Sequence, residues 1–357
     1  MRILVIGGTR DHLGGVEAFC DRAKISMERI CPELRIERLW TSTAYLSLRR
    51  LPAFVLGVLR LIASRARGNA VAWIQYVNLP DLIYVLLAKA LGYETVVTPH
   101  LGLNWKSQRN STLRTISRLI LSRADRIALL SQTQESEISL PSNVQRSLIR
   151  TFLPPEVLEP ISVPANTDKS ELPSGELRLI HASRLSVAKG TFLMLDVCAR
   201  LQAAGVTFSA QIVGSADEET RISLRESIEE KNLSEHVSLL GWATPEQLMG
   251  QLRNADVLVH LSQVDSYPLI VLEALASGTL PLALDLAGAR SMISDYDGFL
   301  VSRLQPVEDA VTHLTTCTLA DIRSRAAAHA GQVRADFAWP TAATLLLESL
   351  QPTRSPT

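Results

Sequence analysis

Residues 256–284 read DVLVHLSQVDSYPLIVLEALASGTLPLAL and contain one complete unit of the predicted fold. The apolar run Asp256–Leu261 predicts a buried strand, and Leu269–Ser277 predicts a helix that begins directly after Pro268. A further apolar run, Leu280–Ala283, predicts the next strand. Two strands joined by a helix pair in parallel, and the helix packs on one face of the sheet. We therefore expect an α/β fold.

The same alternation extends over the rest of the chain. In the second half, strands are expected at Arg178–Ala182, Ser209–Val213 and His236–Leu239, and helices at 190–204, 217–231 and Pro245–Arg253. In the first half, strands are expected at Arg2–Gly7, Ala70–Gln75, Thr95–Thr98 and Arg126–Leu130, and helices at Val16–Ile30, Pro80–Leu91 and 111–123. This pattern predicts two doubly wound, Rossmann-like domains, with ligands in a cleft at the carboxyl ends of the strands.

The length of 357 residues suits two domains of about 150–200 residues each. Residues 154–176 lack apolar periodicity and are rich in Pro, Ser and acidic residues, which is typical of a linker. We expect an N-terminal domain over 1–165 and a C-terminal domain over 175–336. The helical pattern at 337–351 is expected to pack back onto the first domain.

The composition is that of a soluble globular protein, with 46% hydrophobic and 20% charged residues. The sequence runs directly into a strand, so we expect no signal peptide. The apolar stretches 51–63 and 79–92 are shorter than the roughly 20 residues of a membrane-spanning helix. Four scattered cysteines are interpreted as reduced thiols, without disulfide or metal-ligand spacing. These features predict a cytoplasmic protein.

A net charge of zero hides an uneven distribution. Residues 45–126 contain 12 Lys or Arg and only three acidic residues. This excess can help the two halves dock, or form a solvated face. It can equally bind anionic lipid head groups or an anionic acceptor. Nucleic acid is disfavoured because the segment has few aromatic side chains to stack on bases.

Two features of the first half fall where ligand groups are expected. Gly14 and Gly15 precede a helix, and adjacent glycines let the backbone approach an anion at a helix N-terminus. The alternative is a plain strand-to-helix turn. His100 follows a strand, where an imidazole can donate a hydrogen bond to a sugar hydroxyl or phosphate. A lone histidine is more often structural, so this alternative also stays open.

The segment HASRLSVAKG places two cations, Arg184 and Lys189, in a loop between a strand and a helix. A planar guanidinium and a compact ammonium can grip a diphosphate from two sides. The alternative is a solvated loop that carries two ordinary charges.

A third cluster surrounds the helix that follows Pro268. A proline at the first helical position leaves the amides of Leu269 and Ile270 to point at an anion. Asp265 lies in the loop at the mouth of this helix, and Glu273 lies within its apolar sequence. A buried carboxylate needs polar partners, and ribose hydroxyls are suitable ones. The alternative, a solvent-facing Glu273, is disfavoured by its apolar neighbours.

Together these motifs resemble glycosyltransferase family 4, a large retaining group with the two-domain GT-B fold. The resemblance is densest over 178–301 and looser in the first half. The segments that carry it are ASRLSVAKG at 182–190, LGW at 240–242, DSYPLIVLEALASG at 265–278, GGVE at 14–17 and TPH at 98–100.

The resemblance implies a role for each site residue. Arg184 and Lys189 would bind the donor diphosphate, and Glu273 the ribose hydroxyls. Asp265 would lie by the donor sugar and His100 would face the transferring sugar, so these two are the catalytic candidates. The other implied donor-binding residues are Gly14, Gly15, Gly214, Trp242, Tyr267, Leu269 and Ile270.

Two departures from the family pattern concern the donor sugar. The family has Glu-x7-Glu, whereas the first acid here is Asp265, which shortens its reach by one methylene. The family also commonly shows Gly-Gly and a Glu after the following strand, where this chain has DLAGAR at 285–290.

The resemblance implies a retaining hexosyltransferase that moves a sugar from a UDP- or GDP-sugar to a saccharide acceptor. The basic region 45–126 indicates a lipid-linked acceptor, such as one carried by polyprenyl diphosphate, in polysaccharide biosynthesis at the inner face of the plasma membrane. The alternative is that the same helices bind another protein. No Asp-x-Asp cluster stands at a strand end, so we expect no metal and no other cofactor. One alternative is a non-catalytic sugar-nucleotide binder. Another is an NAD-dependent oxidoreductase, whose complete glycine fingerprint neither half contains.

Overall fold

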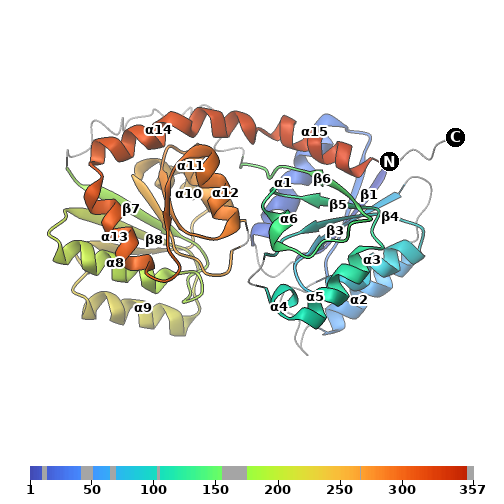
Figure 1. Cartoon of the computed structure of the whole chain (residues 1–357), viewed down its shortest axis with the longest axis horizontal. Helices are drawn as coiled ribbons and strands as arrows, with labels where there is room; N and C mark the ends of the chain where they lie inside the picture. Colours follow the sequence, from blue (N-terminus) through green and yellow to red (C-terminus); the bar gives the residue numbers. More distant parts are fainter. Residues whose placement is uncertain are drawn as a thin grey trace. The chain divides into compact units, whose positions relative to one another are not determined.

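The computed structural model describes residues 1–9, 14–41, 51–64, 70–102, 105–154, 175–265 and 267–351. The chain divides into two compact units, which are labelled by element in Figure 1. Unit 1 consists of Met1–Phe152 and Phe337–Thr357, and unit 2 consists of Leu153–Asp336. Most of the predicted linker lies outside the described residues.

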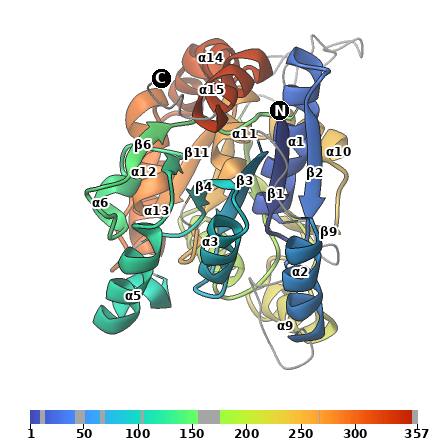
Figure 2. The ribbon, with the colours of Figure 1, turned by 90° about the vertical axis from the view of Figure 1, so that its right-hand side faces the viewer.

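Unit 1 contains a six-stranded parallel sheet in the order β2-β1-β3-β4-β5-β6 (Figure 2). Its strands are β1 (Arg2–Ile6), β2 (Arg35–Leu39), β3 (Ala70–Tyr76), β4 (Glu94–Pro99), β5 (Arg126–Leu129) and β6 (Gln145–Leu148). Its helices are α1 (Gly15–Ile30), α2 (Leu51–Ala63), α3 (Asp81–Ala90), α4 (Lys106–Arg109), α5 (Ser111–Leu121), α6 (Gln134–Glu137) and α15 (Trp339–Leu350).

The strand order of unit 1 changes direction between β1 and β3. Because parallel crossovers are right-handed, the helices on either side of this point cover opposite faces of the sheet. Helix α1 contacts α15 on one face, and α3 contacts both α2 and α5 on the other. The central strand β3 is buried at every position, which agrees with its continuous apolar sequence.

The C-terminal helix α15 packs against α1 within unit 1. Arg126 at the start of β5 is buried, and its Nη1 donates hydrogen bonds to the carbonyl oxygens of Ser349 and, at 3.1 Å, of Gln351. The guanidinium of Arg29 lies 5.6 Å from the ring centroid of Trp339. Both ends of α15 are therefore attached to the first sheet and its helices.

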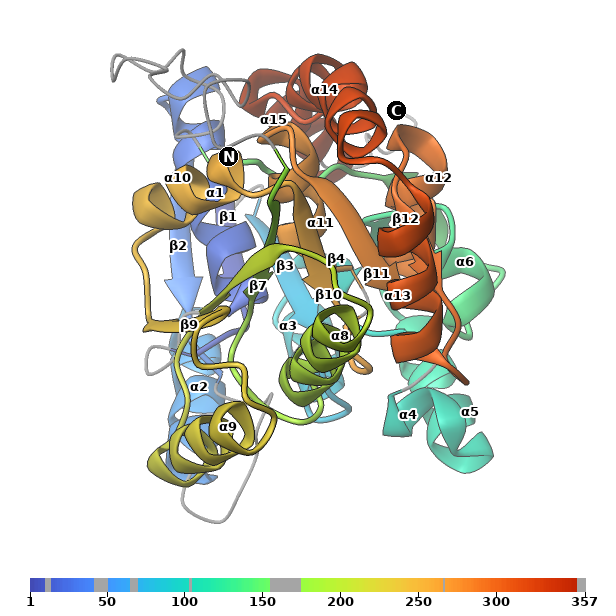
Figure 3. The same cartoon turned by 90° about the vertical axis from the view of Figure 1, so that its left-hand side faces the viewer.

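Unit 2 contains a second six-stranded parallel sheet, in the order β12-β11-β10-β7-β8-β9 (Figure 3). Its strands are β7 (Leu177–Ala182), β8 (Phe208–Val213), β9 (Val237–Gly241), β10 (Val257–His260), β11 (Leu280–Leu284) and β12 (Phe299–Val301). Its helices are α8 (Thr191–Ala203), α9 (Glu218–Glu230), α10 (Pro245–Asn254), α11 (Leu269–Ala276), α12 (Ala287–Tyr296), α13 (Pro306–Thr316) and α14 (Leu319–Asp336).

The order of the second sheet reverses between β7 and β10. Helix α8 contacts α9 and α13 on one face, and α11 contacts α10, α12 and α14 on the other. Asp256, directly before β10, is fully buried and binds Arg178 of β7 and Arg323 of α14, each at 2.9 Å. This pairing compensates the buried charge of Asp256 and attaches α14 to the amino-terminal ends of the central strands β7 and β10.

The predicted α/β class is confirmed, and every predicted strand and helix is present within a residue or two of its expected limits. The sequence interpretation did not include β2, β6, β12, α2, α4, α6, α12, α13 or α14. Within the described residues, no helix combines the length and the apolar character that crossing a bilayer requires.

Candidate functional site

Two predicted site residues meet at the point where the second sheet reverses its strand order. Lys189 follows β7, Asp265 follows β10, and the two side chains form an ion pair between Lys189 Nζ and Asp265 Oδ1. Their side chains are 27% and 21% exposed, so the pair is open to a ligand yet largely shielded. Ligands of open parallel sheets bind at such switch points, outside the carboxyl ends of the strands.

His260, the last residue of β10, completes this cluster. Its Nε2 lies 2.8 Å from Asp265 Oδ2, and its side chain is only 4% exposed. Burial alone would raise the pKa of Asp265, but its pairing with His260 and Lys189 outweighs burial and holds that pKa well below its usual range. The carboxylate is therefore ionised at neutral pH. Sequence reasoning missed His260, because a single histidine ending an apolar strand resembles a core residue.

Gly190 allows the two loops that carry this cluster to touch. Its φ is +77°, and an added Cβ would lie 2.3 Å from the carbonyl oxygen of Leu261. The amide of Gln263 donates to the carbonyl of Ala188 at 2.9 Å, which joins the loops directly. A side chain at position 190 would separate the loop that carries Lys189 from the loop that carries Asp265.

Gly214 plays a similar part between β7 and β8. Its φ is +147°, and an added Cβ would lie 1.7 Å from the carbonyl oxygen of Ser183. Its amide donates to the carbonyl of Gly241 at 2.7 Å, so the ends of β8 and β9 are tied together. Trp242, the next residue, is 64% exposed at this edge. These residues lie at the carboxyl ends of β8 and β9, on the β7 side of the switch point.

Arg184 is exposed on the β7–α8 loop. Its charge acts on Asp217, the N-cap of α9, whose pKa is lowered mainly by hydrogen bonds from Thr220 and to a smaller extent by Arg184. The ion pair brings Lys189 and Asp265 together, while Arg184 acts on the N-cap of α9.

The N-terminus of α11 lies beside this cluster in sequence, three residues after Asp265. Its N-cap, Pro268, offers no side-chain hydrogen bond, and Leu269 and Ile270 are half-buried. Glu273 is 6% exposed, so its carboxylate lies inside the unit and not on a solvent face. Tyr267 is half-buried, and Ser266 lies outside the described residues.

The loop at 285–290, which departs from the family pattern, forms the start of α12. Arg290 donates two hydrogen bonds to Asp285, at 2.6 and 2.8 Å, and the amide of Asp285 donates to the carbonyl of Val301. This acid and this arginine are therefore engaged with each other.

In unit 1, Gly14 and Gly15 stand at the start of α1 as predicted. Glu17 is buried, and its carboxylate accepts hydrogen bonds from the amides of Thr9 (2.9 Å) and Gly14 (3.0 Å). An added Cβ at Gly15 would meet nothing, whereas Gly7 has φ +138° and would clash with Gln75 at 2.7 Å. The glycines that the backbone requires are thus Gly7 and Gly8, whose φ is +76°.

His100 lies at the end of β4, with its Nε2 2.8 Å from Gln75 Oε1 and its ring edge-on to Phe19. Burial lowers the pKa of His100 to about 3, so the imidazole is neutral at physiological pH. A neutral ring whose Nε2–H donates to Gln75 presents Nδ1 as an acceptor.

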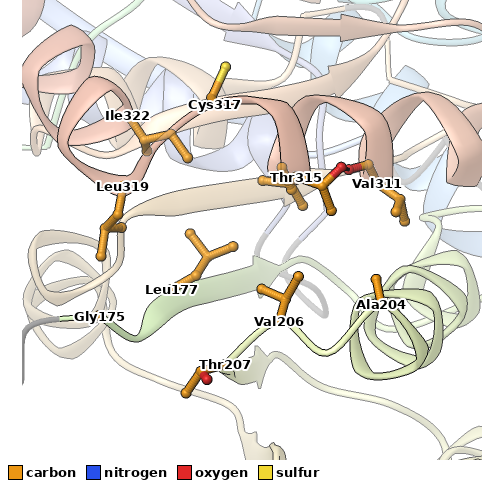
Figure 4. Close-up of a pocket in the computed structure, with 11 residues that line it drawn as sticks. Gly175, Leu177, Ala204, Val206, Thr207, Val311, Thr315, Cys317, Leu319 and Ile322 are labelled. Atoms are coloured by element: carbon orange, nitrogen blue, oxygen red, sulfur yellow. Dashed lines mark hydrogen bonds between the residues drawn. The ribbon is translucent and has the colours of Figure 1, made fainter.

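A pocket of about 530 Å³ lies at the opposite, amino-terminal end of the unit 2 strands (Figure 4). Its lining includes Gly175 and Leu177 at the start of β7, Val206 and Thr207 before β8, and Leu319 at the start of α14. The described lining residues include no charged side chain. A diphosphate site is expected at the carboxyl ends instead.

Two parallel sheets with these connections define a GT-B protein, as expected from the sequence. The chain matches the structure of Anabaena HepE, solved in complex with UDP and glucose, with a TM-score of 0.75 and 17% identity. The match covers 98% of this chain and 99% of HepE. The predicted fold class is therefore confirmed.

Residues 162–325 match the family described as Glycosyl transferases group 1. The predicted resemblance to a glycosyltransferase family is confirmed at this level. The chain is 27% identical to D-inositol 3-phosphate glycosyltransferase of Arthrobacter sp., over 54% of this chain and 47% of that protein. It is 33% identical to phosphatidyl-myo-inositol mannosyltransferase of Mycolicibacterium smegmatis, over 34% and 30%. The chain thus spans less than half the length of either relative.

Proposed function

We propose that the protein is a glycosyltransferase that moves a hexosyl group from a nucleotide diphosphate-sugar to a saccharide acceptor. The observation that carries this proposal is the Lys189–Asp265–His260 cluster at the switch point of a unit with a glycosyltransferase sequence. Lys189 binds the donor diphosphate as a point charge, and Glu273 binds the ribose hydroxyls. The UDP in HepE supports a nucleoside diphosphate as the ligand class.

The proposed reaction breaks the bond between the anomeric carbon and the diphosphate oxygen. Negative charge develops on the leaving diphosphate, and Lys189 and the N-terminal amides of α11 stabilise it. The acceptor hydroxyl forms the new bond from the same face and gives its proton to the donor phosphate. No metal ion is required by this scheme. Retention would be contradicted by an inverted anomeric product in an NMR spectrum.

Donor binding is tested by thermal shift with a panel of UDP-, GDP- and ADP-sugars. We expect one nucleotide class to raise the melting temperature of the wild-type protein. Lys189→Ala should weaken that binding by about tenfold to a hundredfold, because a charge-assisted contact to phosphate is lost. A panel without any shift, or an equal shift in Lys189→Ala, would contradict the proposed site.

A non-catalytic sugar-nucleotide binder is the second candidate, because Asp265 is shorter than the acid of the family pattern. It predicts the same thermal shifts without consumption of the donor. Turnover in the presence of an acceptor therefore separates the two candidates.

We further propose that the acceptor is lipid-linked, by polyprenyl diphosphate, and that unit 1 binds an anionic membrane surface. Apolar side chains that are 41–68% exposed cover the contacting helices α2, α3 and α5. Val55, Leu59 and Ile62 of α2 are among them, with the exposed Arg60 beside them. An exposed apolar face with basic residues is the usual composition of an interfacial helix. The name of the M. smegmatis mannosyltransferase contains a lipid, phosphatidyl-myo-inositol, which is compatible with a lipid-linked acceptor.

Sedimentation with vesicles of phosphatidylglycerol and phosphatidylcholine tests the membrane proposal. We expect wild-type protein to bind, and the double variant Val55→Glu/Leu59→Glu to lose binding, because two charges enter the apolar face. Ile222→Glu on α9, where Ile222 is 46% exposed, is the matched control and should bind normally. Undiminished binding by the double variant would remove the proposal.

A further inference from the structure

His260 belongs to the cluster at the switch point, but neither the family resemblance nor the proposed reaction assigns it a role of its own. It ends β10 at the switch point, and its Nε2 contacts Asp265 Oδ2 at 2.8 Å. The other oxygen of Asp265 is occupied by Lys189. The carboxylate thus has one partner from the β7–α8 loop and one from its own strand.

The contact defines which nitrogen of His260 carries the proton. An ionised carboxylate can only accept hydrogen bonds, so Nε2 donates. The other nitrogen, Nδ1, is buried and has no hydrogen-bond partner among the described residues. The contact with Asp265 is therefore the hydrogen bond that fixes the orientation of the ring.

Binding of a nucleotide diphosphate-sugar would affect the two partners of Asp265 differently. Lys189 is the cation that a diphosphate would attract, and its ion pair with Asp265 must then loosen. His260 is only 4% exposed, so an incoming anion has little access to it. Asp265 would keep the His260 contact when it loses the lysine.

We propose that His260 is a positioning residue that holds Asp265 beside the donor sugar while Lys189 binds the diphosphate. This role rests on the proposed function, because it assumes that Asp265 takes part in sugar transfer. The hydrogen bond from the strand compensates for the short side chain of Asp265, which otherwise could rotate freely once Lys189 is released.

The pairing itself can be measured without turnover. NMR of protein labelled with ¹³C at aspartate carboxyls, assigned by Asp265→Asn, follows the titration of Asp265. We expect His260→Leu to raise the pKa of Asp265, because the donor to its carboxylate is removed. His260→Gln should largely preserve the wild-type value, since its amide nitrogen reaches the position of Nε2, whereas His260→Asn falls short.

The control is His236→Leu, which removes a histidine at the amino end of β9, where its Nδ1 contacts the carbonyl of Phe208 at 3.2 Å. This variant should leave the Asp265 titration unchanged. If His260→Leu does not fold, the His260→Gln and His260→Asn pair decides the same question with two polar side chains.

Kinetics test the consequence for transfer. His260→Leu should lower kcat by about tenfold to a hundredfold while the Kd for the donor changes little, because the lost hydrogen bond acts on Asp265 and not on the diphosphate. An Asp265 titration identical in wild type and His260→Leu, or an unchanged kcat, would overturn the proposal. If wild-type protein turns over no donor, the proposed function fails, while the titration still decides whether His260 holds Asp265.

Discussion

At the scale of single residues, the site depends on glycines that let loops approach each other. Gly190 and Gly214 both have positive φ, and a side chain at either would collide with the backbone of a neighbouring loop. Glycine adopts such angles without the steric penalty of other residues. The close approach of the loops that carry Lys189 and Asp265 therefore depends on Gly190.

Gly214→Ala tests this requirement. The added methyl group would lie 1.7 Å from the carbonyl oxygen of Ser183, so the backbone must move. We expect a loss of about 2–4 kcal/mol in the free energy of unfolding, measured by urea denaturation. The matched control is Gly250→Ala in α10, where an added Cβ meets nothing and helix propensity improves. A Gly214→Ala protein as stable as the Gly250→Ala protein would refute the steric argument.

The sequence identified Lys189 and Asp265 because both stand in loops that follow predicted strands, and because their motifs resemble those of a glycosyltransferase family. It could not show that the two pair with each other. It also could not identify His260, since the geometry that reveals its role joins residues five apart across a turn. For Arg184, the sequence predicted the loop but not the interaction of its charge with Asp217.

At the scale of elements, burial decides which strands could be predicted. The inner strands β3 and β10 are apolar at almost every position because helices cover both faces of the sheet. The edge strands β2, RIERL, and β6, QRSL, carry charged and polar residues, so their sequences lack a strand pattern. Their pairing partners determine their conformation, and those partners are distant in the sequence.

The C-terminal helix gives an element-scale prediction. Arg126 binds the carbonyl oxygens of Ser349 and Gln351, which the end of a helix leaves without partners of its own. Arg126→Met should free the end of α15 and raise amide hydrogen exchange there by about tenfold or more, since roughly 2 kcal/mol of charge-assisted hydrogen bonding is lost. Arg123→Met, at an exposed position in the same segment, is the control. Exchange that is equal in the two variants would contradict this attachment.

At the scale of the whole molecule, alternation of strands and helices was sufficient to predict the fold class. The same alternation occurs in both halves, and each half contains its own sheet with its own reversal of strand order. The alternation of strands and helices does not predict the activity, because many unrelated activities share doubly wound sheets. The charged residues at the second switch point, together with the family match over 162–325, carry the functional proposal.

The central claim is that Lys189 serves the transfer of a sugar from a nucleotide diphosphate donor. The most direct measurement is ³¹P NMR of the preferred donor, incubated with a saccharide acceptor and either wild-type or Lys189→Ala protein. We expect wild type to release nucleoside diphosphate and Lys189→Ala to do so at a rate lowered by about a hundredfold or more. Lys231→Ala, which removes a lysine paired with Asp196 on the far side of unit 2 from the cluster's loops, should keep the wild-type rate. Equal release by wild type and Lys189→Ala would contradict the account.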